Sequence, residues 1–151
     1  MREAERAFGK AVRLYPDDPW AHSYLGSVLM HSDRWPAALR EFLAAVELVP
    51  RWPLFWTDVG LAHAKLGQPR EADAAFRRAQ SLDIADVTSN LRYGQFLMLQ
   101  GRLTRAERFL RRVLRKDPTN VKGKAGTGSS GAEQADSIIG EKRPSAARTA
   151  P

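Results

Sequence analysis

A 34-residue unit recurs along this 151-residue chain and constrains its fold more than any other feature. Each unit carries a hydrophobic residue followed by glycine: Leu25-Gly26, Val59-Gly60 and Tyr93-Gly94. Other columns keep the same step without a gap: Ala38, Ala72 and Ala106; Phe42, Phe76 and Leu110; Ala45, Ala79 and Val113. Subtracting the step from the first unit gives Ala4, Phe8, Ala11 and Pro16. This register is too regular for chance, so the chain is expected to be an array of one structural unit.

The spacing of apolar residues predicts two helices in each unit. In the first unit, Asp18-Pro19 opens a helix, and the polar segment 31–33 separates it from a second helix that begins near Trp35. A glycine inside a helix costs about 1 kcal/mol relative to alanine. We therefore expect Gly26 and its equivalents to allow close approach of the partner helix, at a crossing where Ala38 is also small.

The unit resembles the tetratricopeptide repeat, whose 34-residue helix–turn–helix signature has a hydrophobic-glycine pair followed by small, aromatic, small and proline columns. The resemblance covers residues 3–118 and implies an all-α, right-handed α-solenoid of antiparallel helix pairs. The array would hold a half repeat at 1–18 and full repeats at 19–52, 53–86 and 87–120. His22 and Asn90 depart from the family, which often has tryptophan there, as at Trp56. The array begins with the second helix of a unit whose first helix is missing. We therefore expect an excerpt of a longer array, or a gene start set inside one.

Residues 121–151 change in character: they are rich in Gly, Ser, Ala and Lys and poor in large apolar side chains. Such a composition predicts a disordered tail. The alternative is the first helix of a degenerate fourth unit, because Gly128 continues the glycine register.

No residue pattern indicates catalysis. The chain has no cysteine, which excludes disulfides and thiolate chemistry, and its histidines His22, His31 and His63 lack metal-ligand spacing. Catalytic, cofactor and metal sites are predicted to be none, and the protein is predicted not to be an enzyme. No apolar run of membrane-spanning length and no signal peptide are seen, which favours the cytoplasm.

The resemblance implies a concave groove, lined by the first helices, that takes a peptide or a helix of a partner protein. Carried over residue by residue, the groove-facing set is Trp20, Ser23, Ser27, Met30, Leu54, Thr57, Asp58, Leu61, Lys65, Thr88, Leu91, Arg92, Gln95 and Met98. The leucines and Met98 would supply apolar contacts, and Asp58 and Arg92 would set the register of the ligand. The alternative is that these side chains merely fill a narrow superhelix interior.

One family subgroup grips the C-terminal carboxylate of heat-shock chaperones through a clamp of lysine, asparagine and arginine residues. The corresponding positions here are Ser23, Ser27, Asp58, Thr88 and Arg92. Only Arg92 fits, and Asp58 would repel a carboxylate, so this ligand is not expected.

Tryptophans are frequent at interaction hot spots. Trp35 and Trp56 are predicted to pack between helices, whereas Trp20 and Trp52, at the unit junctions, are the better candidates for an exposed contact surface.

The stretch at 101–118, GRLTRAERFLRRVLRKDP, holds most of the net charge. Residues 1–101 carry 12 basic and 12 acidic side chains, whereas residues 102–118 carry seven basic and two acidic ones. On a helical wheel, one arc is apolar and the other holds the basic patch: Arg105, Arg108, Arg111, Arg112, Arg115 and Lys116. The apolar arc is expected to pack on the unit's first helix and the patch to face solvent. Alternative functions are binding of nucleic acid or anionic lipid through this helix, or service as an accessory segment of a larger membrane or cell-envelope assembly protein.

Overall fold

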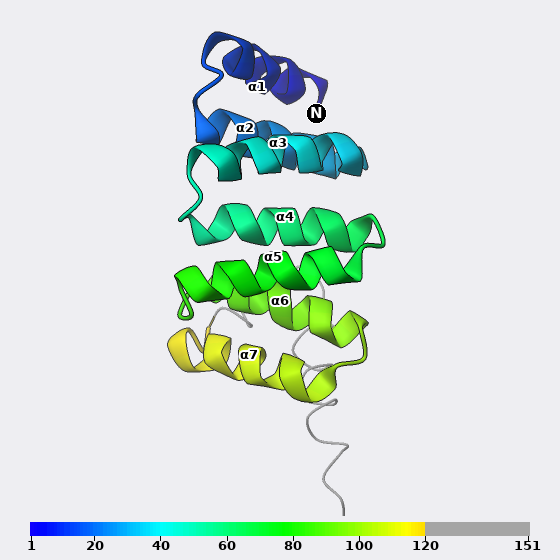
Figure 1. Cartoon of the computed structure of the whole chain (residues 1–151), viewed down its shortest axis with the longest axis vertical. Coiled ribbons are helices and arrows are strands. Elements are labelled where there is room, and N and C mark those ends of the chain that lie inside the picture. Colours follow the sequence, from blue (N-terminus) through cyan, green and yellow to red (C-terminus); the bar gives the residue numbers. More distant parts are fainter. Residues whose placement is uncertain (120–151) are drawn as a thin grey trace, which may run out of the picture.

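The computed structural model describes residues 1–119, which fold into seven α-helices. Their bounds are α1 Arg2–Leu14, α2 Pro19–His31, α3 Trp35–Leu48, α4 Pro53–Lys65, α5 Pro69–Leu82, α6 Val87–Leu99 and α7 Leu103–Lys116. Figure 1 shows them stacked in chain order along the long axis of the molecule. The predicted tail and its possible fourth helix, at 121–151, lie outside the described residues.

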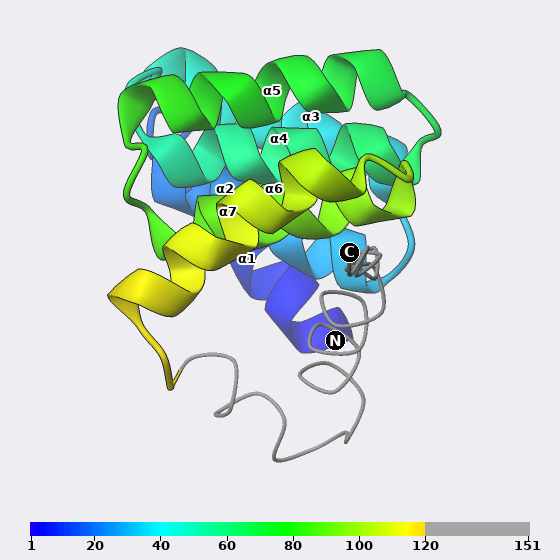
Figure 2. The ribbon, with the colours of Figure 1, turned by 90° about the horizontal axis from the view of Figure 1, so that it is seen from below.

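The helices follow the register of the repeat. The first helices α2, α4 and α6 begin at residues 19, 53 and 87, and the second helices α3, α5 and α7 begin at residues 35, 69 and 103. Each first helix packs on the second helix of its own unit, and α1 and α3 pack on the first helix that follows them. Figure 2, a view from below the stack, shows the layered helix pairs. The predicted all-α solenoid of helix pairs is confirmed.

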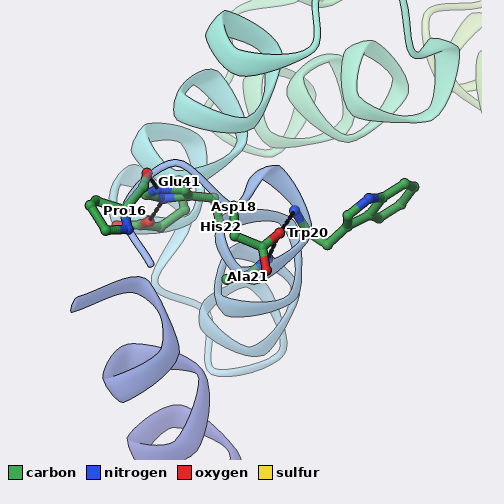
Figure 3. Close-up of polar contacts among 6 residues, drawn as sticks. All are labelled: Pro16, Asp18, Trp20, Ala21, His22 and Glu41. Carbon is green, nitrogen blue, oxygen red and sulfur yellow. Dashed lines mark hydrogen bonds and ion pairs between the residues drawn. The ribbon is translucent and has the colours of Figure 1, made fainter. Parts of the chain in front are cut away.

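Local signals in the sequence define the helix ends. The carboxylate of Asp18 accepts hydrogen bonds from the backbone N–H groups of Trp20 and Ala21, at 2.9 and 3.3 Å, and so caps α2 (Figure 3). The turns inside the units have positive φ at one position each, with Asp33 at 56°, Gly67 at 72° and Gly101 at 70°. Glycine adopts this conformation without steric cost, whereas Asp33 does not.

The repeated helix glycine receives the aromatic column of its partner helix. A Cβ atom on Gly26 would lie 2.6 Å from the ring of Phe42, a contact that real structures do not tolerate, and Phe42 is fully buried. Gly60 meets Phe76, and Gly94 meets Leu110, in the same way. The predicted close approach is therefore present, and the side chains that fill it are Phe42, Phe76 and Leu110.

The junction between α5 and α6 is more polar than the junction between α3 and α4. In α3, Leu39 and Val46 belong to an apolar cluster that includes Phe55 and Val59 of α4. The equivalent positions of α5, 34 residues later, hold Asp73 and Gln80. The array therefore stacks through two different kinds of surface.

Asp73 and Gln80 differ in how the fold satisfies them. Asp73 accepts a 2.7 Å hydrogen bond from the hydroxyl of Tyr93 and forms a 2.9 Å ion pair with Arg77. Both polar atoms of the Gln80 side chain are buried without a partner. The polar junction is thus well bonded at Asp73 and unsatisfied at Gln80.

No helix among residues 1–119 is both long enough and apolar enough to cross a membrane.

Candidate protein-interaction groove

The first helices of the second and third units line an open cavity of about 580 Å³. Its lining residues come from α4 and α6 and are mostly apolar: Leu61, Ala64, Lys65, Arg92, Gln95, Phe96, Met98 and Leu99. We call this cavity the interaction groove. Its volume falls within the range of ordinary ligand pockets.

Five of the predicted groove residues line the interaction groove: Leu61, Lys65, Arg92, Gln95 and Met98. The prediction missed the other three lining residues, among them Leu99. The Leu99 side chain is 86% exposed, the largest exposure of any large apolar residue recorded in the described chain. Its column holds His31 and Lys65 in the other units, so the repeat pattern marks the position as solvent-facing, and only its apolar character is unusual.

Two of the predicted groove residues are wrong, because the structure places them in the interior. Ser23 is 7% exposed and Thr57 is 1% exposed. The Thr57 hydroxyl bonds to the carbonyl of Pro53 at 3.1 Å and shares a 2.7 Å hydrogen bond with the hydroxyl of Ser89 on α6. Thr57 therefore joins α4 to α6 and cannot reach a ligand.

The remaining predicted residues do not line the interaction groove. Trp20 and Thr88 are exposed, whereas the others are half-buried: Ser27, Met30, Leu54, Asp58 and Leu91. The hydroxyl of Ser27 bonds to the carbonyl of Ser23 at 3.0 Å, so part of its capacity is used within α2.

Asp58 of α4 and Arg92 of α6 are close enough to interact electrostatically. Burial raises the pKa of the Asp58 carboxyl from 3.8 to about 7, and the nearby Arg92 guanidinium opposes this shift. Asp58 makes no hydrogen bond or ion pair within the described residues. Near neutral pH it therefore exists both as a carboxylate and as a neutral acid that can donate a hydrogen bond.

An aromatic cluster lies at the N-terminal ends of α2 and α4. The ring of Trp20 lies 5.3 Å from that of Trp52 and 5.1 Å from that of Phe55, in edge-to-face arrangements. Trp20 is 41% exposed and Trp52 is 43% exposed, which agrees with their predicted position on the surface. Trp35 and Trp56 are half-buried, as expected for packing between helices.

The column that holds His22, Trp56 and Asn90 makes the same hydrogen bond in each unit, although the residue type differs. Nε2 of His22 lies 2.9 Å from the carbonyl oxygen of Pro16, and Nδ1 lies 2.8 Å from the carboxylate of Glu41 (Figure 3). The indole N–H of Trp56 donates to the carbonyl of Pro50 at 2.8 Å. The amide of Asn90 donates to the carbonyl of Ile84 at 2.9 Å. In each unit the side chain thus binds the carbonyl six residues before it.

The structure divides the predicted basic patch on α7. Arg108, Arg111 and Arg115 line one surface cavity of about 620 Å³, and Arg111 pairs with Glu107. The others bind within the fold: Arg105 donates to the Tyr93 hydroxyl at 3.2 Å, Lys116 donates to the Ala85 carbonyl at 2.8 Å, and Arg112 lies 5.2 Å from the centre of the Phe109 ring. Half of the patch therefore has a structural role.

Across residues 1–119, no group of three or more His, Cys, Asp or Glu side chains is arranged to hold a metal ion.

The model of the tetratricopeptide repeat matches residues 1–53 and 58–121, which is more than half of the chain. The chain belongs to the tetratricopeptide repeat family. This fold is that of a protein–protein interaction scaffold in general terms, and the predicted family membership is confirmed.

Individual relatives agree with this assignment. The chain is 31% identical over 83 residues to the Hsp70-Hsp90 organizing protein of Triticum aestivum, a match that covers 55% of this chain and 14% of that protein. The tetratricopeptide repeat chain therefore spans only a small part of this curated relative.

Solved structures of MamA share the fold. One has a TM-score of 0.67 at 21% identity and covers 80% of this chain and 71% of its own. Another, MamA 41-end from Desulfovibrio magneticus RS-1, has a TM-score of 0.67 at 22% identity and covers 76% of this chain and 64% of its own.

Proposed function

We propose that this chain is a non-enzymatic scaffold that binds a peptide or a helix of a partner protein in the interaction groove between α4 and α6. The observation that carries the proposal is the apolar cavity of about 580 Å³, which opens beside the exposed Leu99. An apolar side chain that stays in water unless a partner covers it favours association. The groove has room for an apolar side chain of the ligand.

Polar groups around the groove would fix the orientation of that ligand. Arg92, Lys65 and Gln95 offer hydrogen-bond donors to the carbonyls and carboxylates of a peptide. The ammonium of Lys65 lies 5.6 Å from the centre of the Trp35 ring, which restricts where it can reach. Asp58, beyond the cavity, would accept or donate a hydrogen bond according to its protonation.

A peptide library displayed on phage tests this proposal with Leu61→Glu as the groove variant. Serine and glutamine occupy this column in the other units, at Ser27 and Gln95, so the fold is expected to tolerate the change. The control is Leu48→Glu: Leu48 is 38% exposed on α3, and its column holds Lys116 in the third unit.

Wild type and Leu48→Glu should select the same apolar sequences, and Leu61→Glu should retain none of them while its circular dichroism stays helical. Equal selection by Leu61→Glu would reject the groove as the binding site.

We do not expect the C-terminal peptides of heat-shock chaperones to bind, although one relative is named for its chaperone partners. Of the five clamp positions, Ser23 is buried and Arg92 alone carries a fixed positive charge. Partial protonation of Asp58 weakens its repulsion of a carboxylate but supplies no cation. Titration calorimetry with such a peptide should detect no binding, and micromolar affinity that disappears in Arg92→Ala would contradict this.

A second candidate function is binding of an anionic partner through α7, and the arginine-lined cavity of Arg108, Arg111 and Arg115 favours it. Counterion release makes such binding fall steeply with salt, whereas binding in an apolar groove does not. Charge reversal of these three arginines should abolish retention on heparin or anionic vesicles. Retention that persists would exclude this function. Service as part of a larger assembly protein is compatible with either site.

A further inference from the structure

A second cavity, of about 570 Å³, lies between α1 and α3 with α2 beneath it. It shares no residue with the interaction groove, which belongs to α4 and α6. Five arginines line it, Arg2, Arg6 and Arg13 from α1 and Arg34 and Arg40 from the start of α3 and its first turns. The net charge gives no sign of this concentration, because residues 1–101 carry equal numbers of basic and acidic side chains.

Most of this positive charge is not neutralised inside the fold. The two glutamates of the cavity already have partners, since Glu5 pairs with Arg34 and Glu41 lies 2.8 Å from Nδ1 of His22. The other four arginines make no hydrogen bond or ion pair with any described residue. Like charges around one cavity repel each other, so the fold itself gains nothing from this arrangement.

We propose that this cavity binds a short acidic segment of a partner protein, whose carboxylates pair with Arg2, Arg6, Arg13 and Arg40. The planar guanidinium group presents two parallel N–H donors that match a carboxylate. Along α1, Arg2 and Arg13 are separated by roughly 16 Å of helix rise. An extended peptide covers that distance with about five residues.

The walls and the floor favour a peptide over a nucleic acid. Glu5 and Glu41 lie among the arginines, and the floor contains Leu25, Leu29 and Ala37, which suit an apolar side chain between acidic ones. A polyphosphate backbone would leave the cavity and meet the rest of residues 1–101, which carries no net positive charge. A short acidic segment is contained within the cavity and does not reach the surrounding surface.

Fluorescence anisotropy with a labelled peptide of about eight residues, made of glutamates around two central leucines, tests the proposal. The same peptide with glutamines in place of the glutamates is the ligand control. The site variant is the double change Arg6→Gln and Arg40→Gln. Its matched control is Arg51→Gln with Arg78→Gln, two exposed arginines outside the cavity whose side chains have no partner among the described residues.

The glutamate peptide should bind the wild type and the control variant equally, and the site variant should bind about tenfold more weakly, as expected for loss of two charge-assisted contacts. The glutamine peptide should not bind. The site variant should melt at or above the wild-type temperature, because removal of these arginines breaks no contact of the fold. The groove variant Leu61→Glu should bind the peptide normally, which separates this site from the proposed function.

Three results with the peptide alone would overturn the proposal: no binding of the glutamate peptide to the wild type, an equal loss in the control variant, or binding that is lost with Arg108→Gln and Arg115→Gln on α7 instead. Single-stranded RNA that displaces the peptide at lower concentration than unlabelled peptide does would also overturn it, in favour of a nucleic-acid site.

Discussion

Replacement of Gln80 by methionine should stabilise the protein, because its side-chain amide is buried without a hydrogen-bond partner at the junction of α5 and α6. The same column of the repeat holds Val12, Val46 and Leu114. The position therefore suits an apolar side chain, and glutamine is the exception. Methionine is unbranched like glutamine and occupies the same space without the polar atoms.

The magnitude follows from the burial of the amide. A buried donor or acceptor without a partner costs about 1–3 kcal/mol. Gln80 is half-buried as a whole, but Nε2 and Oε1 are both buried, so we expect Gln80→Met to raise the free energy of unfolding by about 1–2 kcal/mol. For an array of this size, the melting temperature should rise by about 4–8 °C.

Thermal unfolding followed by circular dichroism at 222 nm, together with urea titration, measures this effect. The control is Gln95→Met, which makes the same chemical change at an exposed position of α6. Glutamine and methionine have nearly the same helix propensity, so the control removes that contribution. The urea midpoint of Gln80→Met should rise without a change in the slope of the transition.

A melting temperature of Gln80→Met equal to or below that of Gln95→Met would refute the reasoning. It would mean that the Gln80 amide finds a partner in solution, such as an ordered water molecule. The junction of α5 and α6 would then be a satisfied polar interface rather than the weak point of the stack.

Gly26→Ala should lower the free energy of unfolding by about 1–3 kcal/mol in urea titration, because the new Cβ would lie 2.6 Å from the Phe42 ring. Gly9→Ala, where the nearest side-chain atom is 3.9 Å away, should raise it by about 0.5–1 kcal/mol, and a gain at both glycines would contradict the packing argument. Asp33→Gly should raise the melting temperature by about 2–5 °C, because φ is 56° there, and a decrease would show that the aspartate has a compensating role. For Asp58, whose pKa burial raises to about 7, the folded state binds more protons than the unfolded state between pH 4 and 7, so stability falls as pH rises through this window. Asp58→Asn should remove this loss, so its advantage over the wild type should grow by up to about 4 kcal/mol from pH 4 to pH 8, as a pKa raised from 3.8 to about 7 requires, and a constant difference would show that the carboxyl is not desolvated.

The repeat predicted the part of the fold that depends on neighbours along the chain. Helix starts, the turns and the packing role of the helix glycines all follow from residues at fixed spacing, and the structure contains them. The pattern predicted a close approach at each helix glycine without naming the side chain that fills it, and the structure places Phe42 above Gly26. A helical wheel gives the direction of a side chain, whereas the depth at which two helices cross depends on all the side chains between them.

In the candidate sites, too, the repeat predicted which columns share a side of a helix but not which of them are buried. The carried-over pattern correctly brought together Leu61, Arg92 and Met98, but it also included Thr57, which is buried against Ser89. Thr57 and Leu61 lie one turn apart on α4, and α6 covers Thr57 whereas Leu61 stays partly exposed. Leu99 was missed because the repeat marks its position as solvent-facing, with His31 and Lys65 in the other units, and the carried-over groove set did not include it.

The sequence alone determined the repeat unit, its helices and the family, because a periodic pattern fixes local structure wherever it recurs. It also placed the tryptophans of the unit junctions at the surface. Only the tertiary structure decided which charges meet. Arg6 and Arg40 lie 34 residues apart in a segment of balanced charge, yet the stacking of α1 beside α3 brings them to one cavity. The conspicuous arginines of α7 are instead divided between solvent and contacts such as that of Arg105 with Tyr93. Counting charge along a chain cannot reveal this, because electrostatic interaction depends on separation in space, and the stacking of the units sets that separation.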